Sequence, residues 1–150
     1  MTDIRTIWQT DTSYGDWLVT QANGLESGHD LETAMLISLF TDRLAATDDV
    51  IPDNNRRGWH GDTGELYLIG SRLWLLDRAK ITQNTLNSAR DYIVEAIQWL
   101  IDDGIVDTFD ITCEWIKQGS KRFLGAKIVA YKPNGENQLL QYQWAWGTIQ

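Results

Sequence analysis

The hydrophobic pattern of the sequence changes its period at Gly104, and this change constrains the fold more than any other feature. Before that glycine, apolar side chains recur every three or four residues, which predicts a long helix with one buried face. The apolar positions are Leu86, Ala89, Ile93, Ala96, Ile97, Leu100 and Ile101. We expect this helix to begin near Thr82 or Asn84, which are capping residue types, and to stop at Gly104.

After Gly104, apolar and polar residues alternate with a period of two, as in a strand with one buried face. The apolar members of the first such segment are Phe109, Ile111, Cys113 and Trp115. Turn sequences at 118–120 and 133–135 separate it from two further predicted strands, 122–132 and 139–146. These segments predict a three-stranded antiparallel meander.

The front of the chain is predicted to be mainly helical. Asp30 can cap a helix with a wide apolar stripe that reaches Leu44, and Ser71 can cap a short helix over 70–79. A short strand is expected at 16–20, and 47–58 is expected to be a long loop. The predicted fold is therefore α+β, a single domain over residues 1–150. Its helical N-terminal part, with one long helix, packs on the C-terminal meander, which an N-terminal strand could extend.

Composition excludes several classes of function. The net charge of −8 and the pI near 4.6 argue against binding nucleic acid, which requires clustered basic residues. A single cysteine, Cys113, forms no intramolecular disulfide, and with two histidines it supplies too few ligands for a structural zinc site. No apolar run approaches the roughly 20 residues that span a membrane. We therefore expect a protein made in the cytoplasm, with no nucleic-acid or membrane partner.

The sequence offers weak candidates for catalysis. Glu95, Asp102 and Asp107 could form carboxyl pairs, but solvated helix and strand ends explain them better. Cys113 lies on the apolar face of a predicted strand, which favours a buried thiol over a nucleophile. His60 and Asp62 could form an acid–base pair, yet no serine or second base completes it. We therefore predict no catalytic residue, no metal and no cofactor, and expect Glu95, Asp102 and Asp103 to be non-catalytic.

A basic cluster lies on the predicted first hairpin. Its members, within 16 residues that contain no acid, are Lys117, Lys121, Arg122, Lys127 and Lys132. Such a cluster is typical of a solvated strand face that protects a sheet edge. The alternative is a docking surface for an acidic partner.

Three sequence blocks resemble a family of baseplate proteins from Mu-like contractile-tailed bacteriophages. They are Gly58-Trp-His-Gly-Asp62, Ile69-Gly-Ser-Arg-Leu-Trp-Leu-Leu-Asp-Arg-Ala-Lys80 and Glu95-Ala-Ile-Gln-Trp-Leu-Ile-Asp-Asp-Gly104. Leu39-Phe-Thr-Asp-Arg43 fits the same pattern, so the resemblance covers roughly residues 1–115. The structural motif that it marks comprises Trp59, Asp62, Gly70, Arg72, Trp74, Trp99 and Gly104. The family usually has a second tryptophan where this chain has His60.

More distantly, these proteins are similar to the lysozyme-like wedge protein of larger contractile-tailed phages. The Glu-Pro-Arg signature of that protein is absent here, where Trp99-Leu-Ile-Asp-Asp-Gly104 stands instead. The resemblance implies a structural protein of the tail baseplate, present in several copies. Its partners would be other wedge proteins and the tail sheath or tube. The alternatives are a peptidoglycan hydrolase and a sugar-binding tail module.

An open sheet edge at the end of the meander is the expected partner interface. Unpaired strand edges readily accept a strand from another chain. We expect strand 139–146 or strand 122–132 to contact another chain by main-chain pairing or by close docking of the sheet. The expected interface residues are Lys127, Gln141, Gln143, Trp144 and Trp146. Trp74 is expected to be buried, and ion pairing of Arg72 with neighbours such as Asp77 is expected to be weak and superficial.

Overall fold

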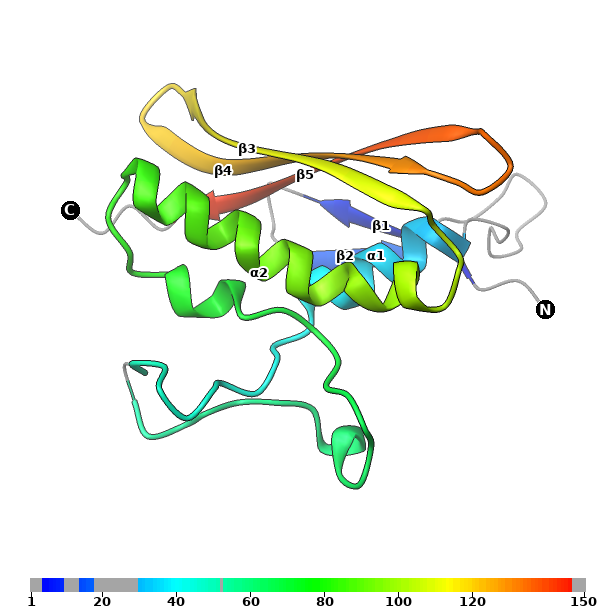
Figure 1. Ribbon diagram of the computed structural model, residues 1–150. Helices are drawn as coiled ribbons and strands as arrows, with labels where there is room; N and C mark the ends of the chain where they lie inside the picture. The colour runs from blue at the N-terminus through cyan, green and yellow to red at the C-terminus, as the bar shows by residue number, and fades with distance from the viewer. Residues whose placement is uncertain (1–3, 10–13, 18–29, 52, 147–150) are drawn as a thin grey trace.

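The computed structural model describes residues 4–9, 14–17, 30–51 and 53–146. A three-stranded sheet lies across one side of a long helix, with a shorter helix and a small two-stranded sheet beside it (Figure 1). The helices are α1 (Asp30–Phe40) and α2 (Gln83–Asp102), with short 3-10 turns at His60–Asp62 and Leu73–Leu76. The strands are β1 (Thr6–Gln9), β2 (Tyr14–Trp17), β3 (Thr108–Gln118), β4 (Lys121–Tyr131) and β5 (Asn137–Trp146). The predicted α+β class is confirmed.

Helix α2 forms where the period predicted it. The Thr82 hydroxyl caps its first turn by accepting a hydrogen bond from the Thr85 N–H at 3.2 Å. Gly104 ends it in the left-handed conformation, with a φ of 75°. The face that packs on the sheet is fully buried, since Ile93, Ala96, Ile97 and Leu100 are each at most 2% exposed.

The large sheet has the order β3-β4-β5, and all of its pairs are antiparallel. Its inner face carries the alternating apolar residues, including Ile111 on β3, Ile128 on β4 and Leu140 on β5, which lie side by side in the register. This confirms the meander and places the core between the sheet and α2. Because β4 is paired on both sides, it has no free main-chain edge.

The N-terminal strands form their own sheet. β1 pairs antiparallel with β2, and among the described residues neither pairs with β5. The expected extension of the meander by an N-terminal strand is therefore not seen in the described part of the chain. The strand predicted at 16–20 is instead Tyr14–Trp17, and residues 18–20 lie outside the described residues.

A long segment connects α1 to α2, and two predictions about the residues at its ends are wrong. Leu44, expected on the stripe of the first helix, lies beyond α1 and is 40% exposed. Ser71 does not cap a helix; its hydroxyl donates to the Leu39 carbonyl at 2.6 Å, because the chain returns here to the end of α1. Gly70 permits this return, since its φ is 96° and a Cβ there would lie 2.3 Å from the Thr41 carbonyl oxygen.

In the part of the chain that is described, neither helix is both long and apolar enough to cross a bilayer.

Candidate partner-binding site

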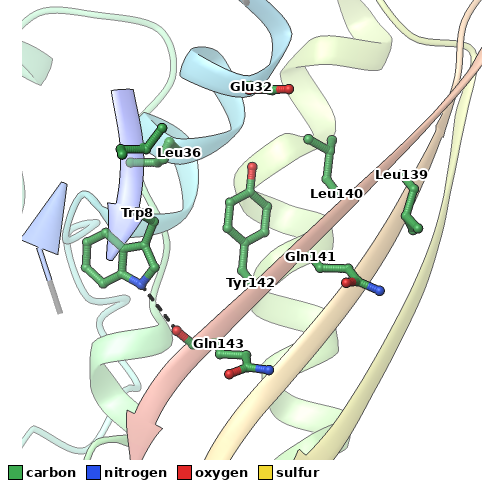
Figure 2. Close-up of a pocket in the computed structure, with 9 residues that line it drawn as sticks. Trp8, Glu32, Leu36, Leu139, Leu140, Gln141, Tyr142 and Gln143 are labelled. Atoms are coloured by element: carbon green, nitrogen blue, oxygen red, sulfur yellow. Dashed lines mark hydrogen bonds between the residues drawn. The ribbon is translucent and has the colours of Figure 1, made fainter. Parts of the chain in front are cut away.

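A groove of about 470 Å³ lies between the N-terminal elements and the last strand (Figure 2). One wall comes from β1 and α1, and the other from the free side of β5. The lining residues are Ile7, Trp8, Glu32, Leu36, Leu139, Leu140, Gln141, Tyr142 and Gln143. The groove is thus bordered by a strand edge and by a mixture of apolar and polar side chains.

Trp8 closes one end of this groove. Its ring stacks on Phe40 of α1, with the ring centroids 3.8 Å apart, and Phe40 meets Tyr142 edge-on at 5.9 Å. The Trp8 indole N–H donates to the main-chain carbonyl of Gln143 at 3.2 Å (Figure 2). A side chain, rather than a strand, therefore joins the small sheet to β5.

The hydrogen bond from Trp8 also shows which main-chain groups of β5 face the groove. In an antiparallel ladder, residues alternate between those that bond to the neighbouring strand and those that point away from it. The carbonyl of Gln143 accepts from the side opposite to β4, so the main-chain groups of Gln141 and Leu139 point the same way. These groups have no strand partner among the described residues. They are free to pair with an added strand.

The other end of the groove is polar. The Glu32 carboxylate lies 3.4 Å from the Arg5 guanidinium and accepts a hydrogen bond from the Gln138 side chain at 3.5 Å. Burial raises the pKa of Tyr142, and the charge of Glu32 raises it further. The Tyr142 hydroxyl therefore stays protonated across the physiological range.

The opposite edge of the sheet is more obstructed. The Arg90 side chain of α2 donates to the Ile111 carbonyl of β3 at 3.4 Å, and the Trp115 indole of β3 donates to the Thr82 carbonyl at 3.3 Å. Both contacts tie β3 to the helix. The β5 edge has a hollow beside it.

The predicted interface residues do not all lie at the groove. Gln141 and Gln143 line the groove, whereas Lys127 lies exposed on β4, on the sheet face away from α2. Main-chain pairing of strand 122–132 with a partner is excluded, because β4 already has a strand on each side. Close docking of its exposed face on a partner stays a prediction. Trp144 and Trp146 belong to β5, but their side chains lie outside the described residues.

A second polar cluster is centred on Arg72. Its guanidinium donates two hydrogen bonds to Glu95 of α2, at 2.9 and 2.8 Å, and contacts both Asp49 oxygens at 3.0 Å. Arg43 also approaches Glu95 at 3.4 Å, and the Arg72 guanidinium lies 4.8 Å from the centre of the Tyr92 ring. The ion pairs of Arg72 are thus made not with Asp77 but with Asp49 and Glu95, each 23 residues away in the sequence, which local spacing does not predict.

Hydrogen bonds shift the pKa values of Arg72 and Asp49 in this cluster. The bonds to Glu95 raise the pKa of Arg72 above its ordinary value, although burial opposes them. Burial by itself raises the pKa of Asp49, but the hydrogen bonds from Arg72 and from the Ala46 N–H outweigh it and lower that pKa. Both shifts favour the charged forms of Arg72 and Asp49, and the contacts of Arg72 with Asp49 and Glu95 fasten the segment between the helices to α2.

The remaining motif residues have structural surroundings. Trp74 is 6% exposed, as expected, and its indole donates to the Arg43 carbonyl at 2.9 Å. The Trp99 indole donates to the Ser38 hydroxyl at 2.9 Å and so joins α2 to α1. The Asp62 carboxylate accepts from the Ile69 N–H at 3.2 Å. Trp59 differs, since it is 48% exposed and covers Gly61.

The candidate catalytic residues are not assembled into a site. Asp62 bonds to the main chain, and no hydrogen bond joins it to His60 among the described residues. Glu95 is engaged by arginines, which corrects the expectation of a merely solvated carboxylate, while Asp102 accepts from Gln98 at 3.1 Å. Burial raises the pKa of Cys113 to about 11, so its thiol stays protonated. The described residues contain no cluster of three or more metal-binding side chains.

Sequence reasoning did not find Trp8, Glu32 or Asp49. Trp8 lies 135 residues from Gln143, and Asp49 lies in a loop whose sequence has no periodic pattern.

Comparison with known proteins identifies the family. The model of the family described as "Phage protein GP46" matches residues 31–137. The chain belongs to the GP46 family of phage proteins. It is 42% identical over 121 residues to "Baseplate protein gp46" of Escherichia phage Mu, an alignment that covers 79% of this chain and 81% of the relative. It is 30% identical over 147 residues to "Mu-like prophage FluMu protein gp46" of Haemophilus influenzae, covering 97% and 98%. The resemblance to Mu-like baseplate proteins is confirmed.

Proposed function

We propose that this protein is a non-enzymatic structural component of a contractile phage tail baseplate. In this role residues 1–150 form one wedge domain, made in the host cytoplasm and incorporated in several copies into the virion tail. Support comes from membership of the GP46 family and from the Mu relative that is named a baseplate protein. The partners would be other wedge proteins and the sheath or tube.

The groove beside β5 is the observation that carries the proposal. An extended segment of a neighbouring tail protein would lie between β1 and β5 and pair with the outward main-chain groups of Leu139 and Gln141. Its alternate side chains would enter a hollow of about 470 Å³ that includes Leu36 and Tyr142. Main-chain pairing would supply much of the affinity, and the hollow would select the side chains.

A proline at Gln141 tests this proposal directly. Gln141→Pro removes one outward N–H without removing a hydrogen bond to β4, and proline is tolerated on strand edges. Gln141→Ala is the matched control, because it shortens the same side chain and keeps the N–H. We expect tails produced with Gln141→Pro to lack the protein or to be incomplete, and tails with Gln141→Ala to be normal.

The thermal unfolding of both purified variants must be measured alongside. If Gln141→Pro unfolds at a much lower temperature, Leu36→Trp provides a second test, because it fills the groove from α1 and leaves β5 unchanged. Tails that contain either well-folded variant at the normal copy number and still contract would refute the role of the groove.

A further inference from the structure

The segment that connects α1 to α2 exposes apolar side chains to solvent. We call residues 42–51 and 53–69 the arm; it projects from the side of α2 opposite to the large sheet (Figure 1). Leu66 is 100% exposed, Val50 92%, Tyr67 69% and Trp59 48%. Leu66 and Tyr67 are neighbours in the chain, and large apolar side chains exposed next to one another are typical of a protein-binding surface.

The arm is held in place although it buries little of its own surface. Arg57 donates to Asp42 at 2.7 Å and lies 4.5 Å from the centre of the Trp74 ring, which is in the core. The contact between Asp49 and Arg72 fixes the arm a second time. The apolar side chains are thus presented on a pre-organised frame, which lowers the entropic cost of binding.

The charge of the arm indicates what it binds. It contains six acidic residues and three arginines. The arginines are engaged within the structure: Arg57 with Asp42, Arg43 with Glu95, and Arg56 with the Ala46 carbonyl. Asp48 and Glu65, by contrast, are exposed, and no ion pair joins either to the described residues. A partner surface should therefore be basic as well as partly apolar.

The tip of the β3–β4 hairpin supplies the basic part of this surface. Lys117, Lys121 and Arg122 are all exposed within six residues, and none pairs with an acid in the described part of the chain. The hairpin belongs to the sheet, on the other side of α2 from the arm (Figure 1). It can therefore meet an arm only on a second copy of the chain.

A hollow in the arm suits a basic side chain. It has a volume of about 360 Å³, and its lining residues include Trp59 and Asp62. A lysine or arginine could place its methylene groups against the ring and its charge near the carboxylate. Arg57 also lines the hollow, but its charge is compensated by Asp42.

We propose that the arm of one copy docks on the β3–β4 hairpin tip of a second copy. The two surfaces differ, so the contact is head-to-tail, and repetition produces a ring or an open chain rather than a closed two-fold dimer. This interaction uses neither β5 nor the groove, and it does not depend on the proposed strand addition.

Reversing the charges of the arm and of the hairpin tip, separately and then together, tests the proposal. The purified wild-type chain should self-associate in sedimentation velocity as its concentration rises, and less so at high salt, because salt screens exposed charges. Lys121→Glu with Arg122→Glu should remove association, as should Asp48→Lys with Glu65→Lys. An equimolar mixture of these two double variants should associate again, since each reversed surface then meets its complement.

Controls separate this contact from general charge effects. Asp103→Lys with Glu136→Lys changes the net charge by the same amount at exposed positions outside the arm and should leave self-association at the wild-type level. Leu66→Ser with Tyr67→Ser should weaken association without changing charge. A wild-type chain that stays monomeric at every concentration, or a mixture of reversed variants that fails to associate, would overturn the proposal.

Discussion

Replacing Arg72 by alanine should destabilise the protein far more than the loss of an exposed ion pair would. The change removes the hydrogen bonds to Glu95 and Asp49 and leaves two carboxylates, 31% and 13% exposed, without their main partner. Breaking a fully buried pair costs about 3 to 5 kcal/mol, and the partial exposure here reduces the expected cost to about 2 to 3 kcal/mol. For a chain of this size that lowers the melting temperature by about 5 to 10 °C.

Thermal unfolding followed by circular dichroism measures this effect. Arg78→Ala is the matched control, because Arg78 lies six residues away and forms no ion pair with the described residues; it should change stability by less than about 0.5 kcal/mol. Arg72→Lys should fall between the two, since lysine keeps the charge and loses the two-pronged geometry. Trypsin should also cleave Arg72→Ala faster after Arg57, because the arm loses its tie to α2. A melting temperature within a degree of wild type would refute the reasoning.

Three further predictions concern the core, the return of the arm and acid stability. Ile97→Ala should cost about 2 to 4 kcal/mol in a urea titration, because Ile97 is 1% exposed and the change leaves a cavity; an unchanged midpoint would contradict its burial. Gly70→Ala should lower the yield of folded protein sharply, since its Cβ would collide with the Thr41 carbonyl, whereas Gly64→Ala, which has open space, should be milder. The folded-state pKa of Asp49 lies below its ordinary value of 3.8, so its stabilising contribution is present above that pH and lost as the pH falls through the folded value. Asp49→Asn should therefore be less stable than wild type at neutral pH, and the difference should shrink in acid titrations.

The sequence by itself determined the parts of this protein whose structure depends on neighbours in the chain. Helix α2 and the three strands of the meander follow from local periodicity, because each buried face repeats every 3.6 or 2 residues. Gly104 and Thr82 marked the helix ends for the same reason. Burial of Trp74 was also predicted correctly.

Only the tertiary structure decided which surfaces and charges meet. The expected cap at Ser71 became a contact with the end of α1, and Arg72, expected to pair weakly nearby, joined Asp49 to Glu95. The groove of the candidate site needs β1 beside β5, a contact across 135 residues. Local patterns predict which side of a helix or strand is buried. They do not predict which other element covers that side. That choice depends on the shape and charge of surfaces that exist only after the elements have come together.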